Sequence, residues 1–237
     1  MRVRHALLVY ASPSSLFRRV EDTGAYGWAL LTLLLLVVLI GYATVQTGLI
    51  DRTVDQDIEA WLAEQEKTRT DLVDRVELRD LVEAAHKEAE FTKLITRLLV
   101  IVWTPVYMLA SFLFIAALLY AMVALTGRKP EYHTLMSIAV YAGFIELIAL
   151  VLGLVMKVYY RTIAVDATLR SLAPEDAPLA EAVLAAIDPF RFWFWVLIAV
   201  GVTVTRQLSR RMAILSVSLM CIVTTAARVG IEYARLM

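Results

Sequence analysis

Charged side chains within long apolar segments are the residues of this sequence with the most scope for chemistry. Glu146 is the only charge between Tyr132 and Met156, and Arg228 and Glu232 interrupt the apolar stretch 212–236. A charge in a lipid environment is costly, so it usually faces the protein interior and has a partner. An acid and a base placed in this way can form a structural ion pair, relay protons or line a transport path.

The spacing of these residues predicts that Glu146 and Arg228 form a pair. Glu146 is nearly as far along the chain from Tyr132 as Arg228 is from Met212. If both segments are helices that begin on the same side, a rise of about 1.5 Å per residue brings the two charges to similar depths. Contact of Arg228 with Glu232 in the same helix is the alternative. We expect a structural role for the pair more than a role in transport.

Composition indicates the elements that must position these charges. The chain has 237 residues, of which 60% are hydrophobic and 19% are charged, and its mean hydropathy is +0.68. Segments 24–50 and 98–127 contain no charged residue. Both are longer than the roughly 20 apolar residues that cross a bilayer as a helix, the form that satisfies every backbone group.

The predicted fold class is therefore all-α, an integral membrane bundle of five transmembrane helices. Residues 1–23 are expected to form a cytoplasmic interfacial segment, and residues 24–237 the membrane domain. An acidic helical loop, residues 51–93, separates the first two spans. The predicted spans are about 26–48, 97–126, 133–157, 189–206 and 212–235.

An aromatic run marks the predicted start of the fourth span. Every residue from Phe190 to Trp195 except Arg191 is aromatic, and Asp188 and Pro189 precede them. Asp is a favoured helix cap, Pro suits the first helical position, and tryptophan gathers at membrane–water boundaries. We interpret Asp188, Pro189, Phe190 and Trp193 as an interface anchor. Arg191 is expected to extend to the lipid headgroups.

The distribution of basic residues predicts the orientation. Short loops rich in Lys and Arg stay in the cytoplasm, and such residues cluster before the first span, after the second and after the fourth. The long loop 51–93 instead has seven basic and thirteen acidic residues. We therefore expect a multi-pass protein of the cell (inner) membrane, with its N-terminus cytoplasmic and its C-terminus outside. Leu16, Phe17 and Val20 of the N-terminal segment are expected to dip into the lipid.

The acidic loop is the only sizeable part predicted outside the membrane. Its apolar residues follow helical spacing, which predicts two helices. Ile58, Trp61 and Leu62 form an apolar stripe that we consider a candidate docking surface for a partner. The alternative is a hairpin that packs only on itself or on the membrane.

No pattern in the sequence predicts catalysis. Phosphate loops, nucleophile elbows and zinc-protease helices are absent from it. His5, His86 and His133 fall in three separate segments, and Cys221 is the single cysteine, so we expect no metal site, cofactor or internal disulfide. The zero net charge gives no sign of nucleic-acid binding.

Three segments carry a resemblance to a known family. They are "SPSSLFRRVED" before the first span, "HTLMSIAVYAGFIELIALVLGLV" in the third, and "IDPFRFWFWVLIAVGVTVTRQLSRRMA" across the fourth and fifth. Their order and content resemble the Yip family, named for the interaction of its eukaryotic members with Rab/Ypt GTPases. The resemblance implies a five-helix bundle without known catalysis. Bacterial members with a helical first loop resemble accessory proteins encoded beside ABC-type exporters.

The expected function is that of a non-enzymatic membrane scaffold or accessory subunit, one that assists the assembly of an ABC-type export complex. Its expected partners are membrane lipids and either transporter subunits or further copies of the chain. A small transporter or channel subunit that uses Glu146 and Arg228 is the alternative. An intramembrane enzyme is the weakest hypothesis, because the sequence shows no nucleophile or metal set.

Overall fold

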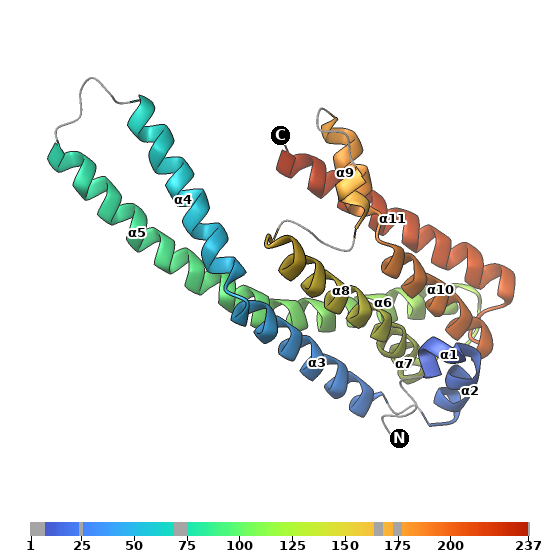
Figure 1. Cartoon of the computed structure of the whole chain (residues 1–237). Coiled ribbons are helices and arrows are strands. Elements are labelled where there is room, and N and C mark those ends of the chain that lie inside the picture. Colours follow the sequence, from blue (N-terminus) through green and yellow to red (C-terminus); the bar gives the residue numbers. More distant parts are fainter. Residues whose placement is uncertain (1–7, 24–25, 69–74, 164–167, 173–176, 237) are drawn as a thin grey trace.

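The computed structural model describes residues 8–23, 26–68, 75–163, 168–172 and 177–236, and all regular structure in these ranges is helical (Figure 1). The sequence-predicted acidic loop includes residues 69–74, and His5 lies in the N-terminal segment; both are outside the described ranges. The helices are α1 (Leu8–Ala11), α2 (Pro13–Thr23), α3 (Gly27–Gln46), α4 (Leu49–Thr68), α5 (Arg75–Leu98), η2 (Leu99–Trp103), α6 (Thr104–Leu125), α7 (Tyr132–Ala142), α8 (Phe144–Tyr160), η3 (Leu169–Leu172), α9 (Pro178–Ala186), α10 (Pro189–Val204) and α11 (Arg210–Leu236).

Four helical stretches of the described chain are long and apolar enough to cross a membrane, and a bent pair makes a fifth candidate. The four are Gly27–Gln46, Val82–Leu125, Tyr132–Tyr160 and Arg210–Ala234, and the pair joins Leu179–Ala186 to Pro189–Val204 at 46°. The all-α membrane bundle predicted from the sequence is confirmed. The bounds of the five spans stay predictions. Helix α9 adds an apolar helix ahead of Asp188, where the predicted fourth span begins.

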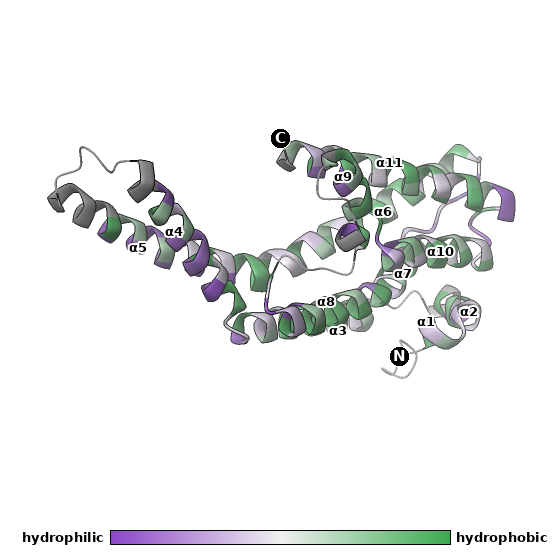
Figure 2. Ribbon diagram, turned by 45° about the horizontal axis from the view of Figure 1, so that its top comes forward, coloured by the Kyte–Doolittle hydropathy of each residue, from purple (hydrophilic) through white to green (hydrophobic). Residues whose placement is uncertain are grey.

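Helix α7 lies at the centre of the bundle. Every residue from Thr134 to Ala142 is buried, and α6, α10, α2, α3 and α8 all contact this helix. The other spans keep broad apolar faces exposed, and α11 is the least buried of the four single stretches. Figure 2 shows apolar residues on the bundle helices and polar residues on α4. The exposed faces suit contact with lipid.

The N-terminal helices α1 and α2 pack into the bundle. Leu16, Phe17 and Val20 are fully buried in the same core cluster as the α7 and α10 residues. The hydroxyl of Tyr10 donates a hydrogen bond to the carbonyl of Phe144, at the start of α8. The expectation that the three apolar residues dip into lipid is therefore not met. Protein side chains cover them, because α2 contacts α10 and α7.

A π-helical turn carries the second span past a proline. The ring of Pro105 would collide with the carbonyl of Ile101 in a regular α-helix, and Pro105 has no N–H to donate. The turn Leu99–Trp103 immediately precedes it, so α5 and α6 join without a break. Gly41 of α3 lies against this turn, since a Cβ there would stand 3.0 Å from the carbonyl oxygen of Val100.

Helices α4 and α5 form a hairpin that extends away from the other helices (Figure 1). Two ion pairs join them near the bundle. The Arg97 guanidinium lies 2.6 Å from a carboxylate oxygen of Asp51, and the Lys93 ammonium lies 2.7 Å from a carboxylate oxygen of Asp55. Ala85 and Ala89 are buried on α5, which allows the two helices to approach closely.

Gly143 separates α7 from α8, and a neighbouring aromatic ring explains why this position is small. A Cβ at Gly143 would stand 2.3 Å from the ring of Phe112, which is itself only 1% exposed on α6. The backbone of Gly143 is helical, with φ −60° and ψ −19°, so conformation alone would allow any residue. The packing of α6 against the α7–α8 junction therefore requires glycine.

We expect Gly143→Ala to destabilise the bundle by about 1–3 kcal/mol, because overpacking a filled interior has that cost. The measurement is the thermal midpoint of the purified protein in mild detergent, followed by circular dichroism. Gly153→Ala on α8 is the matched control, because no atom lies within 4 Å of a Cβ there. It should leave the midpoint unchanged or raise it. Equal midpoints for the two variants would contradict the packing argument.

Candidate functional site

The break between α9 and α10 creates the first part of the candidate site. Asp188 precedes α10, and its carboxylate accepts hydrogen bonds from the backbone N–H groups of Phe190 at 2.8 Å and Arg191 at 3.4 Å. Pro189 occupies the first turn, as its sequence position predicts. If α9 and α10 form one bent span, this cap lies inside the membrane. The role of Asp188, Pro189, Phe190 and Trp193 as an anchor at the membrane boundary stays a prediction.

The aromatic run after Asp188 divides between core and surface. Phe194 and Trp195 are buried at 1% and 3% exposure, whereas Phe192 and Trp193 are 65% and 48% exposed. Phe190 packs partly against the core. The indole N–H of Trp195 has no hydrogen-bond partner in the described structure. The run therefore fastens α10 to the bundle on one side and presents rings outward on the other.

Glu146 and Arg191 form an ion pair between α8 and α10. The Arg191 guanidinium lies 3.9 Å from a Glu146 carboxylate oxygen, and the side chains of Arg191 and Glu146 are 20% and 26% exposed. Each residue stands in the first turn after a helix break, Glu146 after Gly143 and Arg191 after Asp188. Attraction between opposite charges is much stronger in such a poorly hydrated place than in water.

Together with this pair, Arg228 of α11 and Asp188 make a cluster of two acids and two bases. Both residues lie close enough to act electrostatically on the Glu146 carboxylate. Among the ion pairs of the described residues, Glu146 pairs with Arg191 and none joins it to Arg228. The sequence pattern instead assigned Arg191 to the lipid headgroups. The Glu146–Arg228 pair itself stays a prediction.

The spacing of residues in the sequence contains a signal that would place Arg191 at the same depth as Glu146. Arg191 is nearly as far along the chain from Val204, where α10 ends, as Glu146 is from Tyr132, where α7 begins. If these two helix ends share one side of the membrane, both residues lie at about 20 Å from it, given a rise of about 1.5 Å per residue. The aromatic neighbours of Arg191 directed the interpretation toward the membrane boundary instead.

The second candidate site is the apolar stripe on α4. Trp61 is 44% exposed, whereas Ile58 and Leu62 are half-buried. Part of the stripe is therefore covered by the protein itself, and Trp61 is its most exposed residue. On α5 the ring of Phe91 is 64% exposed.

The remaining candidates do not converge. His86 is exposed on α5, and His133 stacks on Tyr26 near the start of α7. Cys221 on α11 is a free thiol. No three His, Cys, Asp or Glu side chains of the described residues meet in a way that could hold a metal ion.

Comparison with protein families identifies the bundle. The model of the Yip1 domain matches residues 7–230, nearly the whole chain. The chain belongs to the Yip1 domain family. The match includes α1 to α10 and most of α11, and therefore the hairpin and the charged cluster. No curated protein and no solved structure matches the chain.

Membership of the Yip1 family indicates a membrane-associated accessory or scaffold protein. Proteins of this family are not known as enzymes. The multi-pass membrane character follows from the apolar helices together with the family. The charged cluster is thus to be explained within a membrane-associated accessory or scaffold protein.

We expect the charges of the cluster to be coupled, most strongly Glu146 with Arg191. Glu146→Gln or Arg191→Gln alone should lower stability by about 1–3 kcal/mol, because each leaves a partly buried charge without its partner. The double variant should recover part of this loss, as a double-mutant cycle of thermal midpoints in detergent would show. A second cycle with Arg228→Gln should give a smaller coupling.

The exposed pair Glu83–Lys87 is the matched control for these cycles. Its atoms are 2.7 Å apart, closer than those of Glu146 and Arg191, but the side chains of Lys87 and Glu83 are 76% and 69% exposed. Water weakens such a pair to a few tenths of a kcal/mol. Strictly additive losses for Glu146 and Arg191, as in this control, would show that the bundle does not depend on their attraction.

Proposed function

We propose that this Yip1-domain chain is a non-enzymatic accessory subunit that assists the assembly of an ABC-type export complex, with the α4–α5 hairpin as its docking element. The observation that carries the proposal is the hairpin itself, which extends beyond the bundle (Figure 1) and has exposed aromatic rings at Trp61 and Phe91. The Yip1 family supplies the accessory or scaffold character.

The hairpin is built as a stiff arm. The second span continues from α5 through η2 into α6, so the arm and a bundle helix are one element. The ion pairs Asp51–Arg97 and Asp55–Lys93 fasten α4 to it. The arm therefore keeps a fixed orientation relative to the bundle, which suits a subunit that holds two membrane proteins together.

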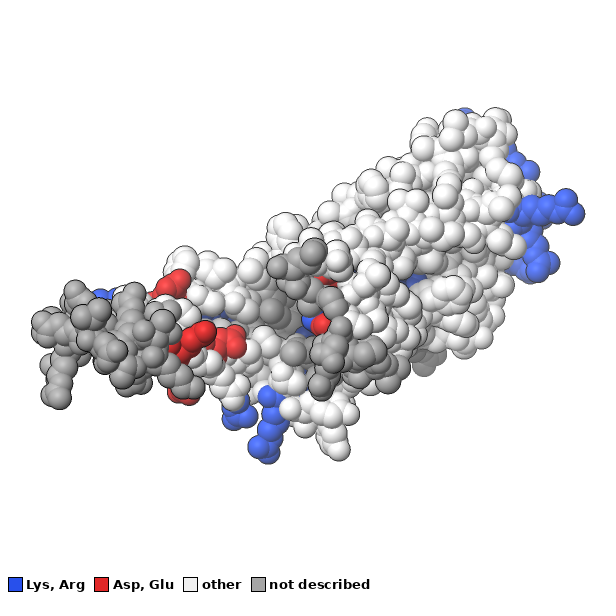
Figure 3. All heavy atoms as spheres, turned by 90° about the horizontal axis from the view of Figure 1, so that it is seen from above, with Lys and Arg blue, Asp and Glu red and all other residues white. Residues whose placement is uncertain are grey.

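The surface of the arm favours a partner with a basic rim around an apolar cleft. Asp55, Asp57 and Glu59 are exposed or half-exposed close to Trp61 on α4. Figure 3 shows acidic side chains on this part of the molecule. Tryptophan is a common anchor of protein interfaces, and complementary charges at the rim select the partner.

Replacing Trp61 should test the docking role. We expect Trp61→Ala to reduce recovery of ABC-type transporter subunits about 30-fold, since an interface anchor contributes roughly 2 kcal/mol or more. The measurement is quantitative mass spectrometry of complexes purified in mild detergent. Trp28→Ala is the control, because Trp28 is 71% exposed but lies on α3. Undiminished recovery with Trp61→Ala would remove the hairpin from the interface, and recovery of this chain alone would indicate a homo-oligomer.

A small transporter or channel subunit is the second candidate function, and the charged cluster at the α9–α10 break favours it. Broken helices with charges at the break are typical of transport sites. Glu146 and Arg228 are the residues that such a path would use. Proton flux into liposomes that contain the purified chain, lost in Glu146→Gln, would support this function over the accessory one.

For the localisation we propose the cell (inner) membrane, with the N-terminus in the cytoplasm and the C-terminus outside. Exposed Arg128, Lys129, Arg206, Arg210 and Arg211 gather where two loops meet, and the Arg128 guanidinium donates to the Arg206 carbonyl at 2.8 Å. The acidic hairpin lies toward the other end of the molecule (Figure 3). Such an asymmetry supports the positive-inside orientation.

Thiol labelling of intact cells should report this orientation. In a Cys221→Ser background, Glu83→Cys on the hairpin should react with a membrane-impermeant maleimide added outside. Arg128→Cys should react only after the membrane is opened, because its loop would face the cytoplasm. The reverse pattern would invert the topology.

A further inference from the structure

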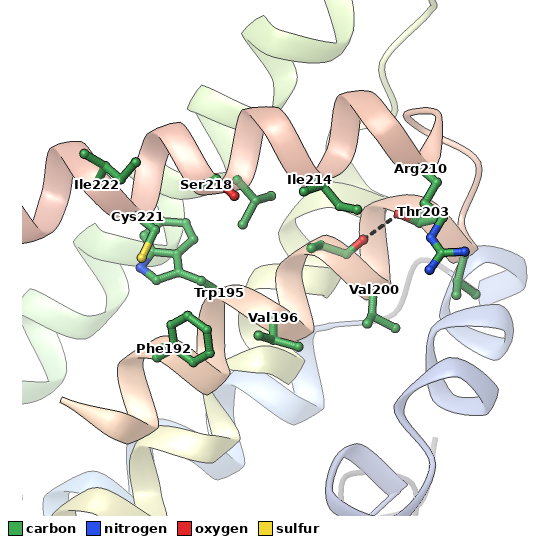
Figure 4. Close-up of a pocket in the computed structure, with 13 residues that line it drawn as sticks. Phe192, Trp195, Val196, Val200, Thr203, Arg210, Ile214, Ser218, Cys221 and Ile222 are labelled. Atoms are coloured by element: carbon green, nitrogen blue, oxygen red, sulfur yellow. Dashed lines mark hydrogen bonds between the residues drawn. The ribbon is translucent and has the colours of Figure 1, made fainter. Parts of the chain in front are cut away.

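A long apolar groove runs between α10 and α11 and takes no part in the charged cluster or the hairpin. Its volume is about 750 Å³, within the range of small-molecule sites. Helix α10 contributes Trp195 and Thr203 to its lining, and α11 contributes Arg210, Ile214, Ser218 and Cys221. Figure 4 shows Arg210 and Thr203 at one end, Ser218 along the wall, and Trp195 and Cys221 toward the other end.

The two ends of the groove differ in charge. Among the described residues that line the groove, Arg210 alone is charged, and it stands at the first position of α11. Exposed Arg206 and Arg211 are close by in the chain, and Arg128 reaches the Arg206 carbonyl. The acid at this end, Glu131, is exposed and accepts a hydrogen bond from Thr134. The end of the groove at Arg210 is therefore basic, and the rest is apolar.

The groove opens on a face that suits lipid. Ile214 and Ile222 line it and are 51% and 65% exposed, and α11 is the least buried of the single candidate spans. Hydrocarbon can reach these side chains from the bilayer. Arg210, at the end of a span, stands where lipid phosphates are found, and basic residues there attract anionic headgroups.

We propose that this groove binds one anionic glycerophospholipid, with a fatty acyl chain between α10 and α11 and the phosphate at Arg210. Charge complementarity at the basic end favours this occupant over the apolar helix of a second copy.

The native cysteine is a reporter of occupancy, because Cys221 is the only cysteine of the chain and lines the groove. We expect phosphatidylglycerol to slow the reaction of Cys221 with N-ethylmaleimide in detergent micelles. Phosphatidylcholine at the same concentration should protect less. Native mass spectrometry of the same samples should show one retained phosphatidylglycerol per monomer.

Two substitutions test separately how the lipid headgroup and the fatty acyl chain contribute to binding. Arg210→Gln should weaken phosphatidylglycerol binding about fivefold, the effect of removing about one phosphate contact. Arg211→Gln is the control, since Arg211 is adjacent and exposed but does not line the groove. Ser218→Phe should obstruct the groove and abolish retention, whereas Leu219→Phe, at an exposed residue outside it, should not.

Four results would overturn the proposal. Equal protection by both lipids would remove the role of the phosphate, and equal effects of Arg210→Gln and Arg211→Gln would indicate diffuse attraction alone. Retention that Ser218→Phe leaves unchanged, with an unaltered thermal midpoint, would place the lipid elsewhere. Protection of Cys221 that appears only with dimers in the mass spectrum would assign the groove to a second copy.

Discussion

The bilayer core contains no water that could hydrogen-bond an unpaired backbone group. Wherever a helix of this bundle is interrupted, the protein itself must therefore supply the partner. The π turn Leu99–Trp103 lets the second span pass Pro105 without a break. At the start of α10 the Asp188 carboxylate takes two backbone N–H groups. At the start of α8 the Tyr10 hydroxyl adds a donor to the Phe144 carbonyl. Each interruption is thus accompanied by a local contact.

The same constraint brings the charges together. Two acids and two bases from α8, α11 and the start of α10 lie near the α9–α10 break, and Glu146 contacts Arg191 there at 3.9 Å. Such a cluster costs less than four separate charges would, since each has an opposite charge nearby. It also ties α8 to α10 and brings α11 close, which helps to fix how these helices assemble.

Sequence alone was sufficient to predict an all-helical membrane bundle, because a soluble fold rarely contains several uncharged runs of about 20 residues. It also identified the Asp188 cap. It did not identify Arg191 as the ion-pair partner, because an arginine among aromatic residues has the same local pattern at a membrane boundary and beside a buried acid. The burial of Leu16, Phe17 and Val20 was missed for a similar reason. An amphipathic helix has one apolar face, and only tertiary contacts decide whether lipid or protein covers it.

The unbroken helix of the second span has a geometric consequence. The 44 residues from Val82 to Leu125 extend about 66 Å at about 1.5 Å per residue. The hydrocarbon core is only about 30 Å thick. Roughly half of this rod must then stand clear of the hydrocarbon, and α5 extends beyond it to Arg75. The helix is thus a molecular ruler, and its length sets the height above the membrane at which a protein bound to Trp61 would be held.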